Sequence, residues 1–306
     1  MKRGIFIIPG FLSIFLSSCL KDDSEELRAE EQRLLEQYLI ENNITAEPTS
    51  SGLYYLPIRE GTGMQPGPGT WSEFEYIGEL IDGTVFHTSD DSIAKANDIY
   101  YEDMLYGVTR MQVGTISLQG LNEGLQLMKV GGRAKFILPS KLALGSSSTS
   151  LIPSYSTLIY TIDLVEAFND PDAHERALIQ QFLIDSNFVT ADSTDSGLYY
   201  IERVEGSGEF ITDGDSADVW YTGYFFDGRI FDSNIEGEPY VVTIPSMYLI
   251  EGWNQGLRLM REGSKGILIL PYYLGYGETG FWDNTGQMKI PPYMTLIFEV
   301  EIESVY

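Results

Sequence analysis

The pattern of hydrophobic and polar positions along this 306-residue chain occurs twice. Residues 51–63, SGLYYLPIREGTG, return at residues 196–208 as SGLYYIERVEGSG, 145 residues further on. Upstream of each copy, residues 34–45 and 178–190 carry apolar side chains at helical spacing. A period of this length exceeds the roughly 20–50 residues of stacked solenoid units, so it indicates a duplicated domain. We therefore expect two units, each an amphipathic helix followed by a sheet domain.

The second copy predicts the elements of the sheet domain. Residues 218–221 alternate as a strand, and Asp227 and Gly228 are typical of a hairpin turn. Residues 250–260 have helical spacing, with Gly263 expected at the helix C-cap. Residues 266–270 and 295–303 are typical of sheet-core strands. The predicted fold class is α+β, with a curved antiparallel sheet wrapped around one short helix in each copy.

Composition and charge exclude several functions. The chain has 19 Lys and Arg against 45 Asp and Glu, for a net charge of -26. A field of this sign repels nucleic acid, so we expect no nucleic-acid partner. The two histidines lie in no metal-ligand spacing, and no glycine-rich loop follows a strand and opens a helix. We therefore expect no metal and no cofactor.

The N-terminus predicts export and a lipid anchor. Lys2 and Arg3 precede an apolar run that falls short of the roughly 20 residues of a membrane span and has signal-peptide proportions. The run ends in Leu-Ser-Ser-Cys, which resembles a bacterial lipobox, and Cys19 is the only cysteine. We expect lipid on Cys19 to anchor the protein in the bacterial cell envelope. The expected site is the outer membrane, on its periplasmic face or, given the acidic run after Cys19, at the cell surface.

We expect the boundary between the two copies at residues 168–172, where Pro171 ends one domain and opens the next helix. The expected parts of the chain follow from this boundary and from the repeat. They are a lipoprotein signal peptide (1–18), an acidic linker and helix (19–47), a first sheet domain (48–168), a linker helix (169–193) and a second sheet domain (194–306).

Five sequence blocks occur in order in the second copy. They are Y-T-G, DG-x-x-FDS, I-x-GW-x-x-G, YG and IPP-x-x-x-L-x-F, beginning at Tyr221, Asp227, Ile250, Tyr276 and Ile290. Together they resemble the FKBP-type peptidyl-prolyl cis-trans isomerases. The resemblance implies two tandem FKBP-like domains and a rotamase acting on X-Pro bonds. The implied partners are proline-containing polypeptides or unfolded exported proteins, and the implied role is protein folding.

The resemblance also implies an aromatic pocket in the second copy. Trp253 would lie under the proline ring, and Asp232 would be a pocket carboxylate. The amide N–H of Ile250 and the phenol of Tyr276 would donate hydrogen bonds to substrate carbonyls. The other implied catalytic and substrate-binding residues would form walls and rim: Tyr221, Phe231, Phe298, Tyr240, Leu249 and Ile290.

The first copy departs from this pattern at the pocket. The segment from Phe86 to Gly120 is 13 residues longer than its counterpart, and the segment over the pocket is six residues shorter. We expect this copy to fold but to be catalytically weak or dead, serving as a spacer or a binding surface. The replaced positions are His87 for Asp232, Leu121 for Trp253, Leu144 for Tyr276, and Tyr160 for Phe298.

Two functional readings stay open. One is a lipid-anchored isomerase with its site in the second copy. The other is a non-catalytic module that holds proline-containing or unfolded segments as a chaperone, which the altered first copy favours. The upstream helices, residues 31–42 and 174–185, could pack on their own domains or form the seam of a homodimer.

Overall fold

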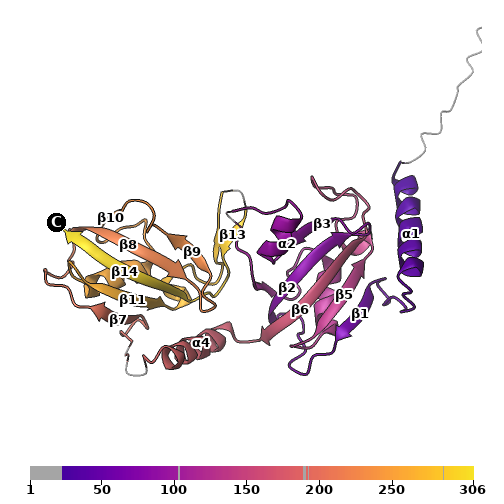
Figure 1. The fold of residues 1–306 in the computed structure, drawn as a ribbon. Coiled ribbons are helices and arrows are strands. Elements are labelled where there is room, and N and C mark those ends of the chain that lie inside the picture. The colour runs from indigo at the N-terminus through magenta and orange to yellow at the C-terminus, as the bar shows by residue number, and fades with distance from the viewer. Residues whose placement is uncertain (1–22, 103, 189–190, 192, 285) are drawn as a thin grey trace, which may run out of the picture.

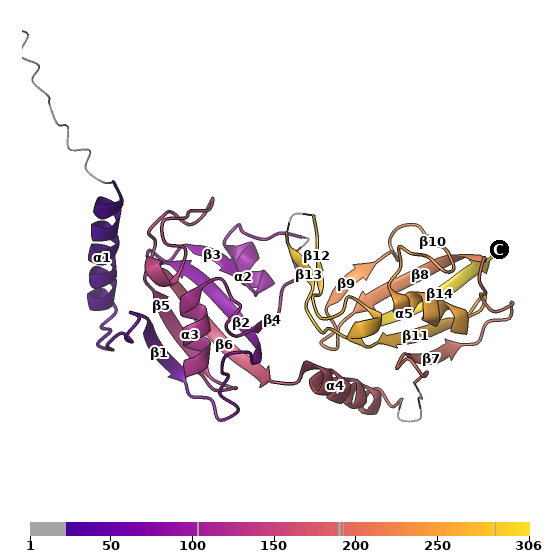
Figure 2. The same ribbon diagram turned by 180° about the vertical axis from the view of Figure 1, so that it is seen from behind.

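The computed structural model describes residues 23–306 except 103, 189–190, 192 and 285. This part of the chain forms two α+β domains side by side, joined by α4 (Pro171–Asp185) (Figure 1). Figure 2 shows α1 (Asp23–Glu41) along the outer side of the first domain, away from the second. The predicted signal peptide and Cys19 lie outside the described residues. No helix in the described part is long and apolar enough to cross a membrane.

The first domain is built on a six-stranded antiparallel sheet of order β1-β5-β6-β2-β3, with β4 also paired to β2. The short helix α3 (Gln119–Leu127) lies across this sheet, because its buried Leu121 and Leu125 pack with Phe136 and Leu138 of β5. Helix α2 (Asp91–Ala96) begins the long segment that the sequence marks as an insertion. The strands are β1 (Tyr54–Arg59), β2 (Trp71–Leu80), β3 (Val85–Thr88), β4 (Thr109–Gln112), β5 (Arg133–Leu138) and β6 (Leu158–Phe168).

The second domain repeats this topology. Its six-stranded sheet has the order β10-β8-β14-β11-β7, with β9 paired to β8, and α5 (Glu251–Gly256) lies across it. A separate hairpin of β12 (Phe281–Trp282) and β13 (Met288–Ile290) has no counterpart strands in the first domain among the described residues. The sheet strands are β7 (Tyr199–Val204), β8 (Ser216–Tyr224), β9 (Ile230–Ser233), β10 (Tyr240–Thr243), β11 (Lys265–Leu270) and β14 (Leu296–Val305).

Glycines in the I-x-GW-x-x-G block allow α5 to lie close to the sheet. A Cβ on Gly252 would come within 2.6 Å of Leu270, and one on Gly256 within 2.6 Å of Leu268. Both leucines are fully buried on β11. The spacing of these two glycines therefore brings α5 onto the sheet, and Trp253, between them, is carried into the core.

Each long helix packs on the outer face of its own domain. Leu35 of α1 is buried with Ile137 and Ile159, on the face of the sheet opposite to the main core. Ile179 and Leu183 of α4 are buried in the same way against β11 and β14 of the second domain. Of the two arrangements that the sequence leaves open for these helices, the structure has packing on the helix's own domain.

Some predicted boundaries are wrong. Helix α1 begins at Asp23, eight residues before the predicted start at Glu31, so Glu25 and Glu26 belong to the helix. Acidic side chains at a helix start are favoured by the macrodipole. Gly263 is not a C-cap, because α5 and a following 3₁₀ turn end at Leu259. With a φ of 79°, Gly263 instead makes the turn before β11. The hairpin at Asp227 and the helix start at Pro171 are confirmed.

Candidate functional site

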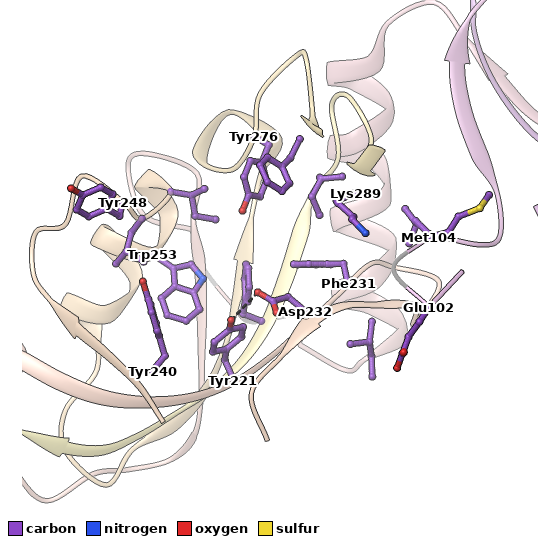
Figure 3. A pocket seen from close by; sticks show the side chains of 17 residues that line it. Glu102, Met104, Tyr221, Phe231, Asp232, Tyr240, Tyr248, Trp253, Tyr276 and Lys289 are labelled. Carbon is purple, nitrogen blue, oxygen red and sulfur yellow. Dashed lines mark hydrogen bonds between the residues drawn. The ribbon is translucent and has the colours of Figure 1, made fainter. Parts of the chain in front are cut away.

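A cavity of about 490 Å³ opens in the second domain between α5, β8, β9 and the β12–β13 hairpin (Figure 3). Its lining includes every pocket residue that the sequence assigns, although these residues come from strands, the helix start and loops far apart in the chain. They are Tyr221, Phe231, Asp232, Tyr240, Leu249, Ile250, Trp253, Tyr276, Ile290 and Phe298.

The base of the cavity is an edge-to-face aromatic cluster centred on Trp253, which is only 4% exposed. Its indole lies 4.9 Å from the Tyr221 ring and 5.3 Å from the Phe298 ring, each at an interplanar angle of 86°. Tyr240 completes the cluster at 6.3 Å. Such T-shaped pairs add roughly 0.5–1.5 kcal/mol each beyond the burial of area, so the indole is held in one orientation.

The glycine of the Y-T-G block lets two cavity walls meet. A Cβ on Gly223 would lie 2.6 Å from Phe231 and 2.9 Å from Phe298. Without that atom, Phe231 stacks edge-on against Phe298 with centroids 5.4 Å apart and an interplanar angle of 90°. The Y-T-G and FDS blocks are therefore linked through packing.

Two of the polar side chains of the cavity are hydrogen-bonded to each other. The Tyr221 hydroxyl donates a hydrogen bond to Asp232 Oδ2 at 2.8 Å. Burial raises the pKa of Tyr221, and the hydrogen bond to Asp232 and the charge of that carboxylate raise it further. Burial, followed by the same carboxylate, also raises the pKa of Tyr276. Both phenols therefore stay protonated and remain donors around neutral pH.

Several donors at the cavity have no partner in the described part of the chain, and two of them are the donors that the sequence assigns to substrate carbonyls. The Tyr276 hydroxyl and the Ile250 amide N–H make no hydrogen bond to any described residue. The loop that carries Ile250 is fixed by Asn254, whose side chain accepts from the Ser246 amide and donates to the Ser246 carbonyl, both at 2.9 Å. The cavity can thus offer preset donors to a carbonyl-bearing ligand without a rearrangement.

Sequence reasoning missed seven cavity residues. Ile230, Tyr248, Phe281 and Lys289 come from the second domain, where Phe281 lies 5.1 Å from the Tyr276 ring. The other three are Glu102, Met104 and Leu105 of the first domain. The insertion between Phe86 and Gly120 is rich in Tyr and Met, and this was the only signal that it meets another surface.

The matching region of the first domain has different chemistry. The Tyr76 hydroxyl lies 2.6 Å from Nδ1 of His87, and the two rings are stacked 9° from parallel. Leu121, in the place of Trp253, is buried in the core, and Leu144 packs against the same core. At the positions of Trp253 and Tyr276, the first domain therefore has neither an indole nor a phenol.

The fold and the aromatic cavity define an FKBP-like domain pair. The family model for FKBP-type peptidyl-prolyl cis-trans isomerases matches residues 63–165 and 207–303. Because these segments cover more than half of the chain, the protein belongs to this family, with one FKBP segment in each domain.

The chain is similar to several known peptidyl-prolyl cis-trans isomerases. The FKBP-type 22 kDa peptidyl-prolyl cis-trans isomerase of Escherichia coli is 41% identical over 112 residues, 36% of this chain and 51% of that protein. Human peptidyl-prolyl cis-trans isomerase FKBP10 is 29% identical over 236 residues, 76% of this chain and 34% of that protein. A solved peptidyl-prolyl cis-trans isomerase from Pseudomonas syringae is 26% identical, covers 44% of this chain and 96% of its own, and has a TM-score of 0.38. The chain thus spans about half, or less, of the length of these two curated relatives.

Proposed function

We propose that the second domain catalyses cis-trans isomerisation of X-Pro bonds in exported polypeptides. The observation that carries this proposal is the aromatic cavity around Trp253, with the unpartnered Ile250 amide and Tyr276 hydroxyl at its edge. It lies in a domain matched by the FKBP family model at residues 207–303.

The proposed mechanism needs no covalent intermediate. Rotation about an X-Pro bond crosses a barrier of about 18–20 kcal/mol, because the planar amide loses resonance as it twists. The twisted amide is less polar at its carbonyl than the planar form, so removal of water favours it. Trp253 would support the proline ring, and Tyr221, Phe298 and Phe231 would exclude water around it.

Hydrogen bonds would hold the flanking chain while the bond rotates. In this proposal the Ile250 amide and the Tyr276 hydroxyl donate to substrate carbonyls, and Asp232 orients the Tyr221 hydroxyl through its hydrogen bond of 2.8 Å. Tyr240, Leu249 and Ile290 would form the rim that accepts the residues next to the proline. Catalysis then arises from binding the twisted form more tightly than either planar form.

We propose further that the protein acts in the bacterial cell envelope, anchored by lipid on Cys19. The support is the sequence of residues 1–19, with its basic start, short apolar run and lipobox-like end. A metabolic label with a radioactive fatty acid tests this: the wild type should incorporate label, and Cys19→Ala should not. Label retained in Cys19→Ala contradicts the anchor. Protease treatment of intact cells then separates surface exposure from the periplasmic face.

The activity is tested by a protease-free isomerisation assay on the protein lacking residues 1–19. Trp253→Leu and Tyr276→Leu copy the residues of the first domain, and we expect each to lower kcat/KM by about tenfold or more. Leu144→Ala, at the position that matches Tyr276 in the first domain, is the control and should leave the rate unchanged. A folded wild type with no rate above background contradicts an enzymatic role.

The second candidate is a non-catalytic holder of proline-containing or unfolded segments. The altered first domain favours it, because Leu121 and His87 replace the indole and the carboxylate there. This function predicts suppression of aggregation of an unfolded client that survives Trp253→Leu. Loss of that suppression together with isomerase activity would assign both effects to the second-domain cavity.

A further inference from the structure

One wall of the cavity in the second domain comes from the first domain. Met104, Leu105 and Glu102 line it, and all three lie in the segment that is 13 residues longer than its counterpart. Figure 3 shows Met104 and Glu102 beyond Phe231, on the side of the cavity opposite to Tyr240. The longer segment therefore reaches the other domain's pocket.

This wall is attached to the second domain by specific contacts. Leu105 packs against the core cluster that contains Trp253 and Phe298. The Tyr106 carbonyl accepts a hydrogen bond of 2.6 Å from Arg229 Nη1, and Arg229 is ion-paired with Asp227 at 2.6 Å. The segment is thus tied to the β8–β9 hairpin, whose Phe231 also lines the cavity.

A buried arginine holds the same segment a few residues later. Arg110 of β4, 2% exposed, is ion-paired with Glu73 at 2.6 Å and with Glu175 of α4 at 2.9 Å. It also donates to the carbonyl oxygens of Pro292 and Tyr293, at 3.3 and 3.0 Å. These carbonyls follow Ile290 at the cavity, so Arg110 joins the first domain to the loop at the cavity rim.

The chemistry of the wall limits what it can contact well. Met104 and Leu105 extend the apolar surface of Ile230 and Phe231, while Glu102 is exposed. Leu105 packs against the cluster that contains Trp253, so with a proline over Trp253 an adjacent residue, whose Cα is about 3.8 Å away, can meet this wall. An apolar side chain there gains contacts with Met104 and Leu105. An acidic one meets the charge of Glu102, because the cation of the cavity, Lys289, is ion-paired with Asp283 at 3.6 Å.

We propose that the first domain is a specificity element of the isomerase: Leu105 and Met104 contact the residue that flanks the substrate proline and favour a large apolar side chain. This proposal rests on the proposed isomerase activity of the second domain. Glu102 adds a bias against acidic residues at the same position. The altered first domain thus contributes to the reaction through its insertion rather than through a pocket of its own.

The test uses two series of short peptides, one varying the residue before the proline and one the residue after it. Each series compares Leu, Ala, Gln and Glu, with kcat/KM from a protease-free assay on the protein lacking residues 1–19. The double variant carrying Met104→Ala and Leu105→Ala should reduce the preference for the Leu peptide over the Ala peptide by roughly fivefold in at least one series. The readout is the ratio of the two rates, so a loss common to the Leu and Ala peptides does not count as a change in preference.

Tyr101→Ala is the matched control, since Tyr101 lies in the same segment, is 63% exposed and does not line the cavity. Glu102→Gln should raise the rate on Glu peptides relative to Gln peptides. If the double variant folds poorly, Met104→Ala alone provides the comparison. Equal losses on all peptides, or unchanged preferences in both series, overturn the proposal while leaving the isomerase in place. A wild type inactive on every peptide overturns the proposed function instead.

Discussion

The two domains have the same sheet order, the same short helix across the sheet and a long helix on the outer face, and they differ in what surrounds that short helix. In the second domain, aromatic rings enclose an open cavity over Trp253. In the first, Leu121 is part of the buried core and Tyr76 is paired with His87. The fold therefore depends little on the residues that make the cavity.

Both domains keep the same close packing of a phenylalanine against a glycine. Gly78 of the first domain and Gly223 of the second each leave room for a phenylalanine, since a Cβ there would lie 2.8 Å from Phe86 or 2.6 Å from Phe231. The same packing thus occurs with and without a pocket. Close packing specifies the architecture, and a few side chains on it determine the chemistry.

A second difference concerns one glutamate in each long helix. In α1, Glu31 accepts hydrogen bonds from the hydroxyls of Ser140 and Thr157 in its own domain. In α4, Glu175 accepts from the Thr295 amide at 2.9 Å and also pairs with Arg110 of the other domain. The equivalent glutamate thus holds a helix on its own domain in the first copy and joins the two domains in the second.

Of the predicted changes, removal of Arg110 should have the largest effect, a loss of stability. Arg110→Ala leaves Glu175 buried without its cation, and breaking a buried pair costs about 3–5 kcal/mol. Urea unfolding followed by circular dichroism should show a corresponding fall in midpoint. The control is Arg133→Ala, whose half-exposed ion pair with Asp163 is worth at most about 1 kcal/mol. Equal effects of the two changes on the unfolding midpoint would contradict a buried ion pair that joins the two domains.

Replacement of the cavity carboxylate, Asp232, by the histidine of the first domain should have the next largest effect, on the isomerisation rate. Asp232→His copies the pairing of Tyr76 with His87 and removes the carboxylate that accepts the Tyr221 hydrogen bond. We expect kcat/KM for X-Pro isomerisation to fall about tenfold, or about 1.4 kcal/mol in the barrier. His87→Asp should leave the rate unchanged. A rate loss in His87→Asp would instead place activity in the first domain.

A smaller effect on stability is expected from pH, through His174 beside the ion pair of Arg110 and Glu175. Burial lowers the pKa of His174, which stacks on Phe168 with centroids 3.8 Å apart. Below its ordinary value of about 6.5, the unfolded chain binds a proton that the folded chain resists, so stability falls as pH drops through that window. The charged groups around this imidazole are Glu73, Arg110, Glu166 and Glu175.

Unfolding midpoints measured between about pH 7 and 5.5 check this sign. His174→Gln should reduce the loss of stability over that range, because the neutral amide has no proton to take up. A His87→Gln variant reports the contribution of the histidine that lies away from this ion pair. Identical pH slopes for the wild type and His174→Gln would show that the imidazole is not linked to folding.

The smallest change, in isomerase activity, is expected at alkaline pH. The pKa values of Tyr221 and Tyr276 are raised above the ordinary value of about 10, so both hydroxyls keep their protons as pH rises. Isomerase activity should therefore stay within about twofold from pH 7 to about 9.5. Loss of activity centred near pH 9 would mean that one of these phenols ionises early.

Most of the second-domain site could be predicted from the sequence, because its motifs are local blocks with fixed spacing. The ten assigned residues meet at one cavity since each block fixes one element and the sheet order fixes how elements meet. Met104 and Leu105 could not be assigned, because no local spacing shows which surface of another domain a loop will contact. The start of α1 at Asp23 was missed because acidic residues are typical both of linkers and of first helical turns.

The shared wall has a consequence for the mechanics of the molecule. A peptide that touches Leu105 and Trp253 together binds more tightly when the domains are docked than when they are apart. By thermodynamic reciprocity, an occupied cavity then strengthens the docking by the same free energy. A force that separates the domains would conversely weaken binding of the peptide. Tension along the chain would therefore release a bound peptide.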